Sequence, residues 1–177
     1  MDVTRGKIRE ARYRNADGRW FVPEGSLVSA LEVIRQSLQN HCDVEPFAVQ
    51  WMIQAIEKGG RKTFAALILI REEKKIIAFL EHYLQSDSQN LDSRLPFSKS
   101  ELETILSPDV ASEFYEHQWE LIAPVFTHRL LHRNIPIEFI LPFVESRRIG
   151  GGGFGDVYEV VITAGHHKFK DINTTKV

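Results

Sequence analysis

The sequence predicts a mainly α protein, in which an N-terminal helical bundle within residues 20–142 is followed by a β-hairpin that begins near residue 143. Between residues 26 and 84, apolar side chains recur at three- and four-residue spacing, which is typical of amphipathic helices. Between residues 143 and 163, β-branched residues flank a run of glycines, which indicates two strands joined by a turn. The composition, with 43% hydrophobic and 26% charged residues, is that of a globular chain with a core.

The first 19 residues form a basic segment that precedes the helical domain. Acidic residues interrupt its basic ones, so a solvated, partly mobile arm is favoured over a patch for RNA or a membrane surface. After it, Asp17-Gly18 predicts a turn, and residues 20–22 predict a short extended segment before Pro23. The basic residues of the arm are Arg5, Lys7, Arg9, Arg12, Arg14 and Arg19.

The helical domain is expected to contain four helices in its first half. The first runs from Ser26 to about residue 38, and the second begins near Pro46 and ends at Gly59-Gly60. A third, very apolar helix covers residues 63–70, and a fourth continues to residue 84 after the charged segment 71–75. Four adjacent apolar faces of this kind predict a small bundle.

The second half of this domain is less regular. Residues 85–98 predict a surface loop, residues 102–106 a short helix, and Ser107-Pro108 the start of a helix that reaches His117. The apolar segment 119–126 is expected to lie on the bundle, and the alternation over residues 135–141 predicts a short strand. Residues 101–120 carry six acidic side chains and no Lys or Arg, for which a solvated helix face is favoured over a docking face for a basic partner.

The most specific pattern lies in residues 149–157, where Gly150, Gly152, Gly155 and Val157 satisfy G-x-G-x-x-G-x-V. The residues that follow favour a strand, not a helix, which argues against a dinucleotide-binding fold and for a hairpin with strands at 143–149 and 157–163. Glycines let a backbone approach a phosphate and direct its N–H groups at the oxygens. A flexible glycine linker is the structural alternative. The candidate nucleotide-binding residues are Ile149, Gly150, Gly151, Gly152, Gly153, Phe154, Gly155 and Val157.

These residues give the chain a resemblance to the eukaryotic protein kinases. Residues 149–160 resemble the glycine-rich loop that opens the kinase N-lobe. A broader resemblance covers residues 119–126, 141–143 and 166–169. These segments look like parts of fungal proteins that have a Ser/Thr-type kinase domain and carry a helical region ahead of it. The resemblance implies that residues 143–177 begin a kinase domain. It also implies ATP and Mg²⁺ as cofactors, with Phe154 covering the phosphates and Ile149 and Val157 packing on adenine.

The sequence also departs from the kinase pattern. Lys168, Lys170 and Lys176 lie in the range of the phosphate-pairing lysine, but none has alanine two positions before it, and no His-Arg-Asp or Asp-Phe-Gly motif is present. We therefore expect a kinase truncated before its catalytic lysine, with no catalytic residues, at most weak ATP binding and no phosphoryl transfer. The alternative is a non-catalytic α-helical protein-interaction module with a vestigial kinase tail.

Composition bounds the remaining possibilities. A net charge of −2 predicts no nucleic-acid partner, and the longest apolar run is too short to cross a membrane. Cys42 is the only cysteine, so an intramolecular disulfide is excluded and an intracellular, cytoplasmic protein is expected. His128 and His132 lack a third metal ligand, and His166-His167 is expected to be a solvated connection after the hairpin, so no metal site is predicted.

Overall fold

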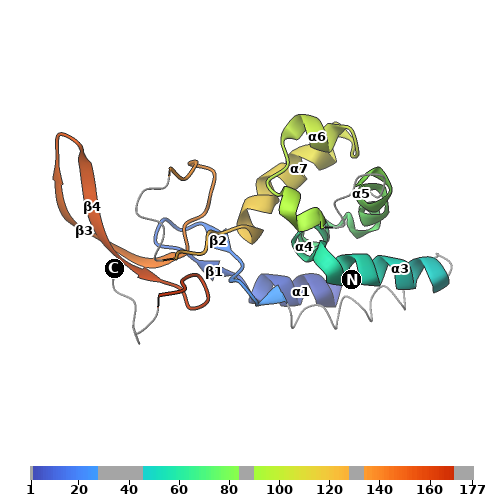
Figure 1. The fold of residues 1–177 in the computed structure, drawn as a ribbon, viewed down its shortest axis with the longest axis horizontal. Helices are drawn as coiled ribbons and strands as arrows, with labels where there is room; N and C mark the ends of the chain where they lie inside the picture. The colour runs from blue at the N-terminus through green and yellow to red at the C-terminus, as the bar shows by residue number, and fades with distance from the viewer. Residues whose placement is uncertain (1, 28–45, 84–89, 128–133, 170–177) are drawn as a thin grey trace.

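The computed structural model describes residues 2–27, 46–83, 90–127 and 134–169, and it confirms the mainly α class. Figure 1 shows the helices gathered at one end of an elongated molecule, and a long β-hairpin extending from the other end. The α-helices in the described residues are α1 (Asp2–Glu10), α3 (Pro46–Gly59), α4 (Arg61–Leu69), α5 (Ile76–Tyr83), α6 (Lys99–Glu103) and α7 (Pro108–Gln118). Single 3₁₀ turns are η1 (Glu73–Lys75), η2 (Leu91–Arg94) and η3 (Trp119–Leu121).

Helix α4 is the centre of the helical domain. All residues from Thr63 to Leu69 are buried, because α1, α3, α5 and α7 each pack against a different part of this helix. The core around it includes side chains from every α-helix of the described residues and extends from Ile8 to Leu121. Burial on all sides explains why residues 64–69 of α4 are all apolar instead of amphipathic.

Most predicted helices are confirmed. Helix α3 begins at Pro46 and ends at Gly59 as expected, α4 and α5 match the third and fourth predicted helices, and α7 begins after Ser107 with Pro108 in its first turn. Helix α6 has a capping box, in which Ser98 and Glu101 satisfy each other's backbone N–H groups. The predicted first helix from Ser26 lies almost entirely outside the described residues, as do Cys42, His128 and His132.

The N-terminal segment is not the solvated arm that its charge pattern predicts. Residues 2–10 form helix α1, which packs on α4 and buries Thr4 and Ile8 completely. Beyond α1, Arg12 pairs with Glu120 at 3.1 Å, and the guanidinium of Arg19 donates to three backbone carbonyl groups of residues 137–139. The prediction was wrong because these arginines find acceptors within the fold, which a charge count cannot reveal.

The strand predicted over residues 135–141 is absent from the described residues 134–142. This segment contains a turn, in which the Phe139 N–H donates to the carbonyl of Pro136 at 3.1 Å, and Ile137 is 89% exposed. Ile140 packs instead in a second cluster with Phe21, Trp119 and Ala123. The apolar segment 119–126 contributes to both clusters: Leu121 packs in the helical core, as predicted, whereas Trp119 packs in the second cluster. None of the four alternating apolar residues is fully buried, because the segment turns instead of extending, and Pro136 and Pro142 have no N–H to donate to a ladder.

Two small antiparallel sheets complete the structure. Strands β1 (Tyr13–Arg14) and β2 (Trp20–Phe21) pair across the turn predicted at Asp17-Gly18. Strands β3 (Phe143–Gly152) and β4 (Gly155–Ile162) form the long hairpin of Figure 1 and confirm the predicted strand–turn–strand arrangement. The described part of the chain adds no third strand to this hairpin.

Candidate functional site

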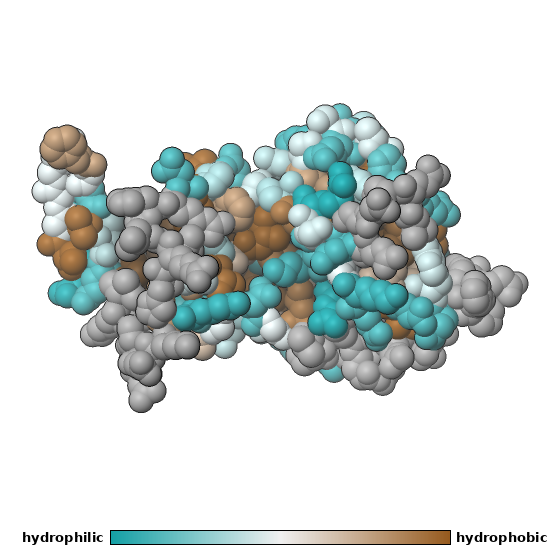
Figure 2. All heavy atoms as spheres, viewed as in Figure 1, coloured by the Kyte–Doolittle hydropathy of each residue, from teal (hydrophilic) through white to brown (hydrophobic). Residues whose placement is uncertain are grey.

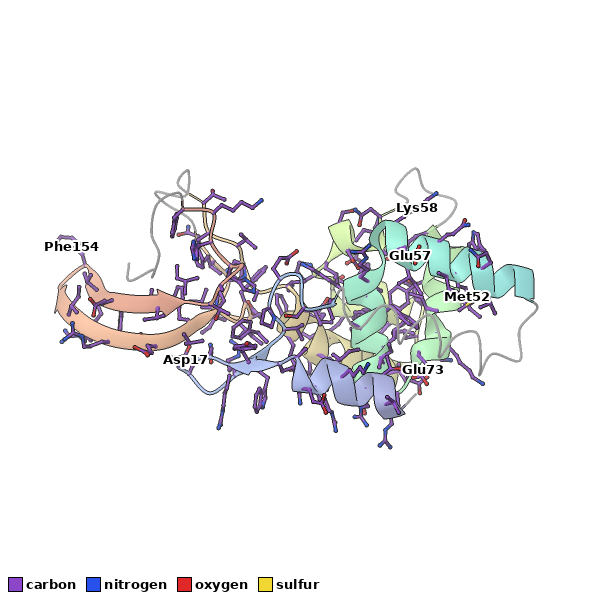
Figure 3. The ribbon with its side chains drawn as sticks, turned by 90° about the horizontal axis from the view of Figure 1, so that it is seen from below. Asp17, Met52, Glu57, Lys58, Glu73 and Phe154 are labelled. Carbon is purple, nitrogen blue, oxygen red and sulfur yellow. The ribbon has the colours of Figure 1, made fainter. Side chains whose placement is uncertain are left out.

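The structure brings the eight predicted nucleotide-binding residues together at the tip of the β3–β4 hairpin. Gly152 pairs with Gly155, so Gly153 and Phe154 form the turn, and Val157 pairs with Gly150. A register shift between Arg148 and Gly150 places Ile149 in a bulge of β3. Figure 3 shows Phe154 at the outermost point of the hairpin, where its side chain is fully exposed.

Two glycines of the tip have a structural reason within the hairpin, one in its backbone conformation and one in the side chains beside it. Gly155 has a φ of 136°, which an L side chain rarely adopts. A Cβ on Gly151 would collide with the carboxylate of Asp156 and the guanidinium of Arg148. In contrast, a Cβ on Gly150, Gly152 or Gly153 would meet nothing within 4 Å, and none of these three has a positive φ. The hairpin could therefore form with larger residues at three of its five glycine positions.

Two cross-strand ion pairs fix the register below the tip. Arg147 lies 2.8 Å from Glu159, and Arg148 lies 2.8 Å from Asp156. Because neighbouring residues of a strand point to opposite faces, one pair lies on each face of the ribbon. Both pairs are largely exposed, so each contributes about 0–1 kcal/mol and acts mainly to hold the register.

Apolar side chains on the outer half of the hairpin are uncovered. Ile149, Val157 and Tyr158 are each at least half exposed, and Figure 2 shows hydrophobic spheres on the part of the molecule that projects at the left. A hollow of about 350 Å³ lies lower on the same hairpin, between Glu145–Arg147 and Glu159–Val161, and it includes none of the eight predicted residues. A two-stranded ribbon with these side chains in water gains little from burial, so its outer half is suited to contact with a further molecule or segment.

The base of the hairpin is joined to the helical domain by a residue that sequence reasoning assigned to solvent. His166 is 1% exposed, and its ring lies edge-on to the buried ring of Phe21, with centroids 5.5 Å apart. Its Nδ1 donates to the carbonyl oxygen of Pro124 at 3.0 Å, and its Nε2 accepts from the backbone N–H of Glu24 at 2.9 Å. Burial lowers the pKa of His166 below its ordinary value of 6.5. The sequence carries no signal of this role, because the ring's partners lie 42 and 142 positions away.

The described residues differ in how well they fit a phosphate group and a metal ion. The glycines at the tip fit a phosphate group, because a phosphate could approach the backbone without meeting a side chain at three positions. Among residues 2–27, 46–83, 90–127 and 134–169, no group of three His, Cys, Asp or Glu side chains could hold a metal ion. These residues therefore do not fit Mg²⁺ as a protein-bound ion.

Comparisons with protein-family models, with curated proteins and with solved structures find no match to this chain. A search for membrane spans finds no helix among the described residues that is both long and apolar enough to cross a bilayer.

Proposed function

We propose that the chain is the N-terminal part of a Ser/Thr-type protein kinase and that the tip of the β3–β4 hairpin is its phosphate-binding glycine-rich loop. The observation that carries this proposal is the presence of three glycines that the hairpin does not need, at positions 150, 152 and 153. A strand glycine costs about 0.5–1 kcal/mol relative to alanine. Glycines without a structural reason at these positions are explained if a ligand must approach the backbone there.

The chemistry of the tip supports a nucleotide phosphate as that ligand. Backbone N–H groups of the loop would donate to phosphate oxygens, and Phe154 would lie over the phosphates and exclude water. Ile149 and Val157, both exposed in this structure, would gain burial by packing against adenine. ATP is the nucleotide that the kinase resemblance implies. Weak binding is expected, because the described residues add no basic side chain dedicated to the phosphates: Arg147 and Arg148 are both engaged in ion pairs.

A valine at position 152 is expected to abolish ATP binding without unfolding the hairpin. Its side chain would occupy the space through which the phosphate approaches, whereas the hairpin leaves that space open and Gly152 has an ordinary φ. Saturation-transfer difference NMR on ATP, which detects weak ligands, should give a signal with the unchanged chain and none with Gly152→Val. Gly6→Ala is the matched control, since Gly6 lies in α1 with equally open space around its Cα, and its signal should equal that of the unchanged chain. Equal signals from all three proteins would refute the role of the loop.

A non-catalytic helical interaction module is the second candidate, and one observation favours it. The main core is built from residues 8–121 and includes no residue of the hairpin, so the helical domain has its own packing. The two candidates differ in the intact gene. An open reading frame that continues past Val177 into an Ala-x-Lys strand and a His-Arg-Asp loop would support the kinase, whereas a stop codon there and a stably bound protein partner would support the module.

A further inference from the structure

The junction between the hairpin base and the helical domain depends on the protonation state of one side chain. The segment after β4 turns at Gly165, which has a φ of 86° and whose Cβ position lies 3.3 Å from the carbonyl oxygen of Glu24. This close turn places the His166 ring between the segment after β2 and the segment after η3. Both partners of the ring are backbone groups with fixed roles, since the Glu24 N–H can only donate and the Pro124 carbonyl can only accept.

These partners define the tautomer. Nδ1 must carry the proton and Nε2 must offer its lone pair, so the ring is neutral in this arrangement. A second proton on Nε2 would face the Glu24 N–H at 2.9 Å, which would replace a hydrogen bond by two opposed donors. The buried edge contact with Phe21 adds an apolar surface that disfavours the charged ring further.

The charged groups around His166 do not compensate for this loss. Glu24 carries the nearest carboxylate, but that carboxylate lies 3.0 Å from the ammonium group of Lys62 at the start of α4. Glu24 and Lys62 therefore act on an imidazolium with opposite signs. On its own segment, His166 is followed by His167 and Lys168, and neither supplies a negative charge.

The same segment holds further bonds that would open together with the ring. The Phe126 N–H donates to the His166 carbonyl at 2.8 Å, and the Lys168 N–H donates to the Phe126 carbonyl at 2.8 Å. On the other side of the junction, the N–H and hydroxyl of Thr163 both donate to the carbonyl of Pro142. Residues 163–168 thus form one hydrogen-bonded unit, and His166 is its deepest member.

We propose that His166 is a protonation-sensitive latch, which holds the base of the β3–β4 hairpin against the helical domain when its ring is neutral and releases residues 163–168 when the ring is protonated. The inference does not depend on nucleotide binding, because it concerns the attachment of the hairpin and not its tip. If the tip does bind a phosphate, the latch gives that loop an acid-sensitive orientation relative to the helices.

The direction of the pH response follows from the lowered pKa. An open latch exposes His166 with its ordinary pKa of 6.5, so the open form binds more protons than the closed form below that pH. The latch therefore makes its full contribution above pH 6.5 and loses it progressively as the pH falls. As the pH falls from about 7.5 to about 5.5, the opening constant rises by at most about tenfold, the limit in which only the open form takes up a proton.

Hydrogen exchange measured residue by residue tests the latch. After division by intrinsic exchange rates, protection of the Phe126 and Lys168 amides should fall over that range, by up to about tenfold, while the Phe97 amide, bonded to Gln118 in the helical core, should not change. His166→Gln should remove the pH dependence, and His82→Gln, on the exposed side of α5, should keep it. An unchanged response in His166→Gln, or no response in the unchanged chain, would overturn the proposal.

A second measurement decides the case if His166→Gln fails to fold. Long-range ¹H–¹⁵N correlation spectra of the unchanged chain identify which ring nitrogen carries the proton. The latch requires a proton on Nδ1 and none on Nε2 at about pH 7.5, and any ring that becomes protonated on Nε2 at lower pH must have lost the Phe126 and Lys168 hydrogen bonds. A proton on Nε2 at that pH, or ring protonation without loss of amide protection, would contradict it.

Discussion

Replacing Phe114 by alanine is expected to destabilise the helical domain by about 3–5 kcal/mol, the largest effect of any single substitution considered for this chain. Phe114 of α7 is completely buried and stacks on Phe79 of α5, with ring centroids 5.3 Å apart. Phe97, also buried, lies 6.1 Å from Phe114 and 5.5 Å from Phe79. Truncation would leave a cavity at the centre of three mutually contacting rings that come from different parts of the chain.

Chemical denaturation followed by circular dichroism at the helical band measures this loss. Phe154→Ala is the matched control, since it removes the same atoms from a fully exposed ring, and it should change the free energy of unfolding by less than about 0.5 kcal/mol. A cost below about 1 kcal/mol for Phe114→Ala would mean that the three rings are not packed as described.

Replacing Asp92 by alanine is expected to lower the free energy of unfolding by about 2–3 kcal/mol, the second largest effect predicted for this chain. Helix α4 begins after Gly60, which provides no side-chain cap. Asp92, in η2, supplies the cap from a distance: its carboxylate accepts from the N–H groups of Lys62 and Thr63 and from the Thr63 hydroxyl, at 2.9–3.1 Å. Burial raises the pKa of Asp92, and these hydrogen bonds oppose that rise. Alanine would leave the start of the central helix, where Thr63 is fully buried, without an acceptor.

The chemistry of the cap predicts that thermal stability decreases from the unchanged chain to Asp92→Asn and then to Asp92→Ala. An asparagine side chain cannot serve both groups of donors, because its amide nitrogen would face one of the N–H groups. Asp92→Asn should therefore fall between the unchanged chain and Asp92→Ala in thermal unfolding. Asp109→Ala removes an exposed acid from the first turn of α7 and should cost less than about 1 kcal/mol. Asp92→Ala and Asp109→Ala with equal melting temperatures would contradict the capping role.

The elements that sequence reasoning predicted correctly are those set by local signals. Apolar runs bounded by Pro46, by the Gly59-Gly60 pair and by Ser107-Pro108 define α3, α4 and α7, since caps and breakers act within a few residues. The glycine run between two β-branched segments correctly predicted the β3–β4 hairpin and the grouping of its eight tip residues. Such signals do not depend on the rest of the fold.

The errors in the N-terminal segment and at His166 involve residues whose partners are distant in sequence. Arg12 finds Glu120, Arg19 finds the carbonyl groups of residues 137–139, and His166 finds Pro124 and Glu24. In each case a polar side chain in a polar segment is satisfied by tertiary contacts, and no periodicity marks it. Five of the six acidic residues in 101–120 are exposed, in agreement with the predicted solvated helix face, and Glu120 is the exception because it pairs with Arg12.

The proposal that the hairpin tip binds nucleotide phosphates is tested most directly by ¹H–¹⁵N correlation spectra of the chain titrated with ATP in the presence of Mg²⁺. The account predicts progressive, saturable shifts of the amides of residues 149–155 and of Val157, with ADP acting similarly and adenosine much more weakly, because the phosphates provide the contacts. Amides of the helical core such as that of Phe97 should not move. If the amides of residues 150–155 do not shift at any ATP concentration, or if adenosine and ATP shift them equally, the hairpin does not bind phosphate.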